Sequence, residues 1–215
     1  MHEVAENYQP AVSHCRYKNV IFDLGGVLLY FNPRELVDKI FADAERKPYE
    51  LVHAVGTEQW TDMDRGKLTY PEVAQALSDT YNPAQLCYYL ESIPAHLNPI
   101  VDGLAIVEEI KKRGYKTYVL SNLSAFSHES SMNLPGFFDL FDGAIFSYQV
   151  GFAKPDPEIY QALLMKYNLV AEECVFIDDL EKNITAGKAL GIDGILCDDY
   201  AKVRSELVKR EILLA

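Results

Sequence analysis

Polar side chains follow three short apolar runs of this 215-residue sequence, and a lysine lies in a loop stiffened by Gly and Pro. In chain order these residues are Asp23, Ser121, Asn122, Lys154, Asp178 and Asp179. A carboxylate able to attack phosphorus, a hydroxyl, an ammonium and a pair of acids suit a phosphoryl group held beside a divalent cation. The pattern predicts this chemistry if the fold brings the residues together.

Magnesium is the cation that such a set of residues favours. Three carboxylates within a few ångströms would repel one another and raise their pKa values unless a cation neutralised them. Mg²⁺ prefers hard oxygen ligands and needs only one or two carboxylates plus a phosphate oxygen. We therefore expect Mg²⁺ as the cofactor.

A carboxylate that attacks phosphorus gives an aspartyl-phosphate, which water can then cleave. We expect Asp23 to be this nucleophile. The charge that develops on the phosphoryl oxygens needs ammonium, hydroxyl or amide donors. Lys154 and Ser121 suit that role, and we expect Asn122 and Gly26 to complete the phosphate-binding set.

Each of these residues also has an ordinary structural interpretation. Asp followed by Gly is common in turns, acids often cap the helix that follows a strand, and loop lysines are usually solvated. The carboxyl ends of parallel strands meet at one edge of a sheet, and ligands bind there. The joint placement at strand ends is therefore what favours the functional interpretation.

The elements that must position these residues alternate between strand and helix. Strands are predicted at Lys18–Asp23, Tyr115–Leu120, Ala144–Ser147, Cys174–Ile177 and Gly194–Cys197. From about residue 99 onward, helices are predicted at Ile100–Arg113, Pro157–Tyr167, Glu181–Leu190 and Ala201–Lys209. This alternation indicates an α/β fold with a Rossmann-like, doubly wound parallel sheet.

The segment from 32 to 98 has a different pattern, with helices only. They are predicted at Glu35–Phe41, Pro48–Val55, Thr57–Met63, Pro71–Leu77 and Pro83–Ile93. We read Asp62-x-Asp64-x-Gly66 as a turn between two of them, and expect Trp60, Tyr88 and Tyr89 to pack in their core. The predicted domains are an arm (1–17), a core (18–31 and 99–215) and a helical domain (32–98) inserted at the carboxyl edge of the sheet.

Composition and charge exclude several classes of partner. The net charge of −12 argues against nucleic acids and against anionic membranes, which bind Lys and Arg. No apolar run is long enough for a membrane helix, and the acidic start is unlike a signal peptide. Four scattered cysteines favour a reducing, cytoplasmic location. We expect a small phosphorylated metabolite as the partner and a monomer or weak dimer.

Four segments of the sequence resemble the motifs of a known superfamily. Val20–Leu28, Val119–Asn122, Gly151–Tyr160 and Val175–Asn183 resemble, in order, the four motifs of the haloacid dehalogenase (HAD) superfamily of hydrolases. The helical segment is similar to the helical cap of that superfamily in position and character. The nearest subgroup contains sugar-phosphate phosphatases and the phosphatase domain of soluble epoxide hydrolases.

The resemblance implies a role for each matching residue. Asp23 would be the nucleophile and a metal ligand. Ser121 and Lys154 would bind the phosphoryl group. Asp179 would bind the metal directly, with Asp178 acting directly or through water. The implied activity is that of a Mg²⁺-dependent phosphoric monoester hydrolase, for which a sugar phosphate is one candidate substrate.

The chain departs from the superfamily pattern at Gly25. The resemblance implies that this residue lends its backbone carbonyl to the metal, but phosphatases of the superfamily usually carry a second Asp here as general acid and base. Such help is typically worth ~10²–10⁴-fold in rate. Its loss should favour substrates with good leaving groups, unless a residue from the helical segment replaces the missing acid.

Two other functions stay open at this point. A haloacid dehalogenase uses the same Asp on carbon and needs no metal, but it has little use for the acid pair Asp178-Asp179. Alternatively, Gly25 marks a regulatory protein that binds phosphate with little turnover. Dependence on Mg²⁺ and a panel of phosphate esters would separate these possibilities.

Overall fold

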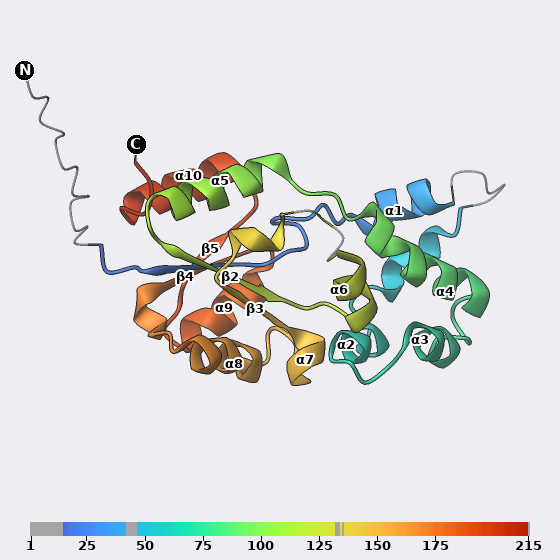
Figure 1. The fold of residues 1–215 in the computed structure, drawn as a ribbon. Coiled ribbons are helices and arrows are strands. Elements are labelled where there is room, and N and C mark those ends of the chain that lie inside the picture. The colour runs from blue at the N-terminus through green and yellow to red at the C-terminus, as the bar shows by residue number, and fades with distance from the viewer. Residues whose placement is uncertain (1–14, 42–46, 132–133, 135, 215) are drawn as a thin grey trace, which may run out of the picture.

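Five parallel strands form one sheet at the centre of the molecule (Figure 1). The computed structural model describes residues 15–41, 47–131, 134 and 136–214. The strands are β1 (Asn19–Phe22), β2 (Lys116–Ser121), β3 (Gly143–Phe146), β4 (Cys174–Asp178) and β5 (Asp193–Leu196), in the spatial order β3-β2-β1-β4-β5. β1 and β4 are buried along their whole length, as expected for parallel strands covered on both faces.

Helices cover both faces of the sheet. α5 (Val101–Lys112) and α10 (Tyr200–Lys209) lie on one face, and α8 (Pro157–Tyr167) and α9 (Glu181–Ala189) on the other (Figure 1). Successive side chains of a strand point to opposite faces. Accordingly, Val20 and Phe22 pack in one apolar cluster and Ile21 packs in the other. The predicted doubly wound α/β fold is confirmed.

Between β1 and β2 the chain forms helices before it returns to the sheet through α5. They are α1 (Pro33–Ile40), α2 (Glu58–Asp64), α3 (Tyr70–Ala76) and α4 (Pro83–Ser92), with the 3₁₀ helices η1 (Tyr49–Ala54) and η2 (Ile93–His96). Their starts follow local rules, since Asn32, Thr57 and Asn82 accept backbone hydrogen bonds at the N-caps. These elements, which we call the helical insertion (residues 32–98), lie at one end of the core beside α6 and α7 (Figure 1).

The remaining elements are short. They are α6 (Ala125–Ser131), η3 (Phe138–Leu140), α7 (Ser147–Val150) and η4 (Ala171–Glu173). Several predicted boundaries shift by a residue. Ser147 begins α7 instead of ending β3, because its hydroxyl donates to the Asp64 carbonyl and accepts from the Leu123 amide. Only long-range contacts fix that boundary, so the sequence pattern missed it.

Three further predictions need correction or restriction. Asp64 belongs to helix α2, so the predicted turn begins only after it, and Gly66 has the left-handed φ of 73° that a turn requires. Tyr89 is buried as expected, but Tyr88 is 53% exposed. Of the predicted arm, residues 1–14 lie outside the described residues, and Tyr17 packs in the core.

No helix within the described ranges combines the length and the apolar character needed to cross a bilayer.

Candidate active site

The order of the strands brings three of the predicted site residues to neighbouring strand ends. β1 lies between β2 and β4, so Asp23, Ser121 and Asp178 end adjacent strands at one edge of the sheet. All three are buried, with exposed fractions of 8%, 2% and 0%. A buried carboxylate needs a charged or hydrogen-bonding partner, because water no longer solvates it.

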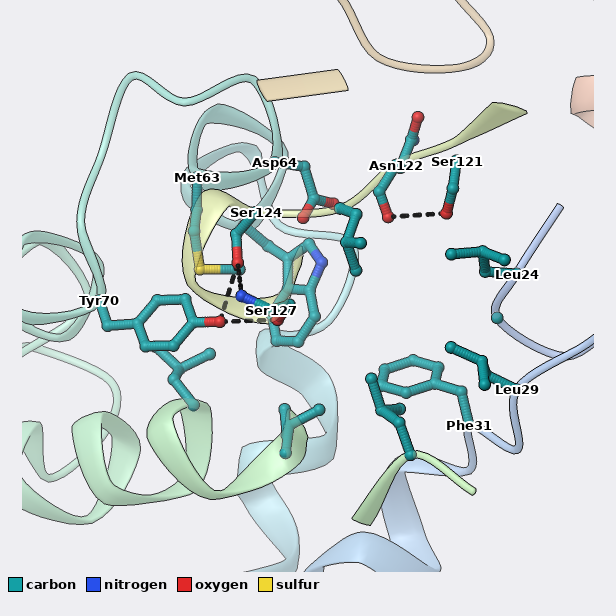
Figure 2. Close-up of a pocket in the computed structure, with 16 residues that line it drawn as sticks. Leu24, Leu29, Phe31, Met63, Asp64, Tyr70, Ser121, Asn122, Ser124 and Ser127 are labelled. Atoms are coloured by element: carbon teal, nitrogen blue, oxygen red, sulfur yellow. Dashed lines mark hydrogen bonds between the residues drawn. The ribbon is translucent and has the colours of Figure 1, made fainter. Parts of the chain in front are cut away.

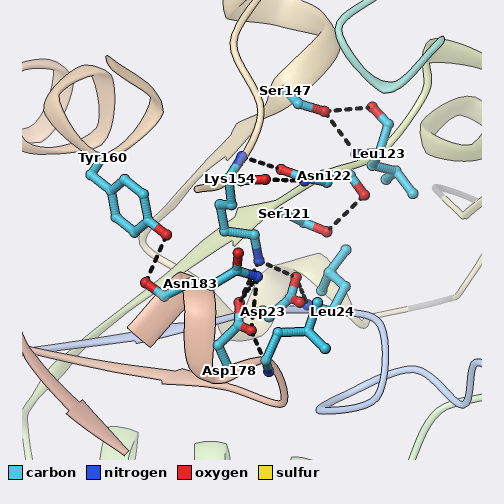
Figure 3. Close-up of polar contacts among 11 residues, drawn as sticks. Asp23, Leu24, Ser121, Asn122, Leu123, Ser147, Lys154, Tyr160, Asp178 and Asn183 are labelled. Carbon is cyan, nitrogen blue, oxygen red and sulfur yellow. Dashed lines mark hydrogen bonds and ion pairs between the residues drawn. The ribbon is translucent and has the colours of Figure 1, made fainter. Parts of the chain in front are cut away.

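Lys154 supplies the positive charge between two of these carboxylates. Its Nζ lies 2.8 Å from Asp23 Oδ1 and 2.7 Å from Asp178 Oδ2 (Figure 3). The side chain of Asn122 holds the lysine backbone in place, because its Nδ2 donates to the Lys154 carbonyl at 2.9 Å and its Oδ1 accepts from the Lys154 amide at 2.7 Å. The end of β2 therefore positions the loop that carries the ammonium.

Asp178 has several further donors around it. Its Oδ1 accepts from the Leu180 amide at 2.8 Å, and Asn183 Nδ2 donates to Oδ1 and Oδ2 at 3.0 and 3.1 Å (Figure 3). Both of its oxygens are thus used by the protein. This arrangement suits a carboxylate that orients Lys154, and it leaves Asp179, whose side chain is exposed, as the more available acid.

Asp23 has one oxygen engaged by the protein. Its Oδ1 accepts from the Leu24 amide at 2.7 Å and pairs with Lys154. Within the described residues, no hydrogen bond or ion pair involves Oδ2, so this oxygen is the one available to attack a substrate.

Burial and charge shift the pKa values of the site. Burial raises the pKa of Asp23 to about 7, and Asp178 and Asp179 push it in the same direction, while Lys154 opposes them. Burial, and then repulsion by Asp178, raises the pKa of Asp179. Burial alone would lower the pKa of Lys154, but the two carboxylates beside it raise it above its usual value. The site thus has one ammonium for three carboxyl groups.

The acids of the site fit a divalent metal ion. Asp23, Asp178 and Asp179 each offer a carboxylate oxygen, and these atoms all lie within 4.8 Å of one another. Hard oxygen donors at this spacing suit Mg²⁺, which would also relieve the repulsion that helps to raise the pKa values of Asp23 and Asp179. The residues present therefore fit the ion expected from the sequence.

The two glycines after Asp23 have different surroundings. Gly26 has a φ of 74°, and a Cβ there would lie 2.5 Å from Asp179 Oδ2, so only glycine lets this acid approach the loop. Its amide donates to the Leu29 carbonyl at 2.9 Å. A Cβ on Gly25 would have Phe31 Cβ as its nearest neighbour, at 3.8 Å, so the site has room for a side chain there.

A pocket opens beside Leu24 and Gly25, which follow Asp23, between the strand ends and the helical insertion (Figure 2). It has a volume of about 110 Å³, and Leu24 and Gly25 line it next to Ser121 and Asn122. Most of the other lining side chains are apolar and come from the insertion or from the loop after β1, among them Leu29, Phe31, Trp60, Met63, Leu90 and Ile93. The helical insertion thus forms much of the wall.

The lining of this pocket includes a carboxyl group that we did not predict as a site residue. Asp64 ends α2, is 9% exposed, and has its backbone carbonyl bound by the Ser147 hydroxyl at 2.5 Å. Burial raises the pKa of Asp64 to about 7, a hydrogen bond from Trp60 opposes the shift, and the charge of Asp23 adds to it. The sequence signal was an acid four residues after Trp60, which places both on one face of the helix.

The structure brings together most of the predicted site residues. Asp23, Lys154, Asp178 and Asp179 form one cluster, and Ser121 lies at the next strand end. The side chain of Asn122 is hydrogen-bonded to the backbone of Lys154, as described above. The roles of all these residues toward phosphate and metal, and those of Gly25 and Gly26, stay predictions.

Comparison with known proteins gives the family. The profile of the haloacid dehalogenase-like hydrolases matches residues 17–191. The sesquiterpene phosphatase astK of Aspergillus oryzae is 27% identical over 89% of this chain and 95% of its own length. The D-ribitol-5-phosphate phosphatase of Bacteroides thetaiotaomicron is 29% identical over 88% of this chain and 96% of its own length.

A solved structure shares the fold. The HAD family enzyme bt-2542 of Bacteroides thetaiotaomicron, crystallised with magnesium and inorganic phosphate, superposes with a TM-score of 0.63 at 24% identity, covering 87% of this chain and 98% of that one. The family profile spans most of the sequence, including every residue of the Asp23 cluster. The chain therefore belongs to the haloacid dehalogenase-like hydrolases.

Proposed function

We propose that this protein is a Mg²⁺-dependent phosphatase that hydrolyses a small phosphorylated metabolite through an aspartyl-phosphate on Asp23. The observation that carries the proposal is the cluster of three carboxyl groups at one edge of the sheet, two of which pair with the Lys154 ammonium. The names of the two relatives, both phosphatases, support this reaction. The crystal structure with magnesium and phosphate supports the same cofactor and ligand.

The residues of the chain suit two successive displacements at phosphorus. Asp23 Oδ2 attacks, and the ester P–O bond breaks with its electron pair on the alcohol oxygen, which takes up a proton. Water then attacks the same phosphorus, the bond to Asp23 breaks, and inorganic phosphate leaves. The Lys154 ammonium and the Ser121 hydroxyl stabilise the phosphoryl oxygens in both steps.

Asp23 and Asp179 would hold the metal, with the Gly25 carbonyl as a further ligand and Asp178 acting directly or through water. When bound, Mg²⁺ supplies positive charge that offsets the charge on the phosphoryl oxygens. Residues 32–98 would serve as the cap over this site, and residues 18–31 and 99–215 as the core that carries it.

A panel of phosphate esters assayed with and without a chelator tests the proposal. Wild type should hydrolyse at least one ester, the chelator should abolish turnover, and Asp23→Asn should be inactive. Asp198→Asn is the matched control, because this exposed acid also follows a strand, β5, but lies outside the cluster. Its activity should equal that of wild type.

The same panel separates the alternatives. Turnover of a haloacid that survives the chelator would favour a dehalogenase. A wild type that is inert on every ester but binds Mg²⁺ and phosphate would favour a regulatory protein. Gly25→Asp, which has room for its side chain, should keep or raise phosphatase activity.

A further inference from the structure

The pocket beside Asp23 offers few polar groups to a substrate. Tyr70, Ser124 and Ser127 line it, but the Tyr70 hydroxyl lies 2.8 Å from the Oγ of each serine, so these groups satisfy one another (Figure 2). Both polar atoms of the Asn122 side chain are hydrogen-bonded to the Lys154 backbone. The polar atoms of the wall are therefore largely taken up within the protein.

Apart from the Asp64 carboxyl group and the Ser121 hydroxyl, the rest of the wall is largely apolar. Leu29, Phe31, Leu90, Ile93 and Leu97 are among its lining residues, and the part of the chain that the structure describes contributes no Lys, Arg or His to it. A sugar or polyol that entered would give up its hydrogen bonds to water and replace few of them. A hydrocarbon group would instead gain from leaving water.

We propose that this pocket binds the hydrocarbon part of the substrate, so that the enzyme prefers phosphate monoesters of alkyl or prenyl alcohols over sugar or polyol phosphates. The inference rests on the proposed phosphatase function. A volume of about 110 Å³ suits a short chain next to the phosphate, because an apolar cavity of roughly 150 Å³ accommodates benzene. The names of the two relatives indicate different substrate classes, a sesquiterpene and a polyol phosphate. The largely apolar wall of the pocket favours the hydrocarbon class.

Two substrates with the same five-carbon backbone test this preference. n-Pentyl phosphate and ribitol 5-phosphate differ only by the hydroxyl groups of the polyol. We expect kcat/KM to be at least ~100-fold higher for pentyl phosphate, and to rise by about fourfold per methylene from ethyl to pentyl phosphate. Equal or higher kcat/KM for ribitol 5-phosphate would overturn the inference.

A pair of variants locates the preference in the pocket. Leu123→Asn places an amide in the wall at a half-buried position, and should lower the ratio of pentyl to ribitol turnover by about tenfold, mainly through KM. Met165→Asn, at a side chain that is 82% exposed on α8, should leave the ratio unchanged. An unchanged ratio in Leu123→Asn would contradict the assignment.

Acetyl phosphate keeps the two proposals apart. It has no chain to fill the pocket and an acidic leaving group, so it reports on the phosphoryl chemistry alone. Its hydrolysis without a preference for pentyl phosphate would overturn the substrate class and leave the phosphatase function standing. No hydrolysis of any phosphate would overturn the function itself.

A second observation concerns the acid missing at Gly25. Asp64 presents a buried carboxyl group to the pocket that Gly25 also lines, and the Ser147 hydroxyl fixes the helix end that carries it. It lines this pocket together with Gly25, two residues after Asp23, and with Ser121 at the end of the neighbouring strand. Figure 2 shows its carboxylate on the same side of the pocket as Ser121 and Asn122.

We infer that Asp64 replaces the missing acid and base of the phosphatase reaction. The protonated carboxyl gives its proton to the alcohol oxygen as the ester bond breaks. The resulting carboxylate then takes a proton from the water that attacks the aspartyl-phosphate. The buried position, which keeps a carboxyl group protonated closer to neutral pH, suits this donor role.

The leaving group of the substrate tests this role. Asp64→Asn should lower kcat for pentyl phosphate by ~10²–10⁴-fold, because its alkoxide needs a proton, and should lower kcat for acetyl phosphate by less than about tenfold. Adding Gly25→Asp to Asp64→Asn should restore much of the lost rate on pentyl phosphate. Asp62→Asn, two residues earlier on α2, is the matched control and should match wild type.

Equal losses on both substrates would show a structural role for Asp64 and overturn the inference. Full activity of Asp64→Asn on pentyl phosphate would also overturn the inference.

Discussion

Lys154 is the residue on which the buried charges of the site depend. It is 4% exposed and is the ion-pair partner of both Asp23 and Asp178, which are themselves buried. A buried ion pair adds little net stability, but removing one partner leaves an unpaired charge in the protein interior, where water does not solvate it. The ammonium therefore stabilises the fold, in addition to the phosphate binding that we propose for it.

Lys154→Met should lower the free energy of unfolding by about 3–5 kcal/mol, measured by urea denaturation. Lys202→Met is the control, because its ion pair with Asp198 is exposed and should contribute less than about 1 kcal/mol. Equal stabilities of the two variants would contradict the buried cluster.

Gly26 lets the Asp179 side chain approach the loop after β1, where we propose that the metal binds. A Cβ at position 26 would lie 2.5 Å from Asp179 Oδ2, so Gly26→Ala should displace the acid and weaken Mg²⁺ binding. We expect Mg²⁺ at about 100 times its Kd to stabilise wild type by ~2.7 kcal/mol, and the variant by much less. Thermal denaturation with and without Mg²⁺ measures this.

Gly56→Ala is the matched control for the backbone. Gly56 also has a positive φ, of 86°, but nothing lies within 4 Å of a Cβ there. Without Mg²⁺, Gly56→Ala should lower the free energy of unfolding by about 1–2 kcal/mol, as the strained backbone of Gly26→Ala also should. Added Mg²⁺ should stabilise Gly56→Ala as much as it stabilises wild type. A full Mg²⁺ effect in Gly26→Ala would contradict the placement of Asp179.

At the scale of elements, helix α5 packs closely on the loop that follows β1. A Cβ on Gly103, in the first turn of α5, would lie 2.5 Å from the Val27 carbonyl oxygen. Gly103→Ala should therefore destabilise the protein by about 1–3 kcal/mol in urea denaturation. Gly187→Ala, in α9, meets nothing closer than 3.6 Å and should be neutral or stabilising by up to about 1 kcal/mol.

Strand β5 and helix α10 are joined by an ion pair whose contribution depends on pH. Burial raises the pKa of Asp193, but hydrogen bonds from Arg210 and Tyr17 outweigh it and lower the pKa to about 2. The carboxylate thus titrates lower in the folded than in the unfolded chain, where its pKa is 3.8. Its stabilisation is present above pH 4 and is lost as the pH falls toward 2.

Asp193→Asn should therefore lower the free energy of unfolding by about 1 kcal/mol at pH 6, after allowance for solvent screening. The loss should be progressively smaller at pH 4 and pH 3. Urea denaturation at the three pH values measures the difference from wild type. Asp79→Asn, at an exposed acid, should differ little from wild type throughout. A loss of stability in Asp193→Asn that grows as the pH falls would contradict this pH dependence.

At the scale of the whole molecule, local patterns of the sequence predicted the α/β core well. The runs around Ile21, Val119 and Phe176 are buried on both faces of the sheet, so continuous apolar character marked them as strands. The acids and the hydroxyl at their carboxyl ends could be placed at one edge for the same reason. Local pattern and global fold agree in this part of the chain.

What the sequence could not give was the orientation of the helical insertion. Trp60 faces the pocket, Tyr89 is buried in the core and Tyr88 is exposed, although all three are aromatic residues on short helices. The sequence pattern predicts a turn at Asp64. Its burial depends instead on the packing of α2 against α7 and on a hydrogen bond from the distant Ser147 hydroxyl to its carbonyl. Such contacts between distant segments leave little trace in local periodicity.

The central claim is that Asp23 accepts a phosphoryl group, and trapping that group tests it most directly. The enzyme is mixed with Mg²⁺ and pentyl phosphate, quenched in acid within one turnover, digested and analysed by mass spectrometry. We predict one phosphoryl group on the peptide that contains Asp23 in wild type, and none in Asp23→Asn. Turnover of the ester by Asp23→Asn at the wild-type rate, with no phosphorylated peptide in either protein, would contradict the account.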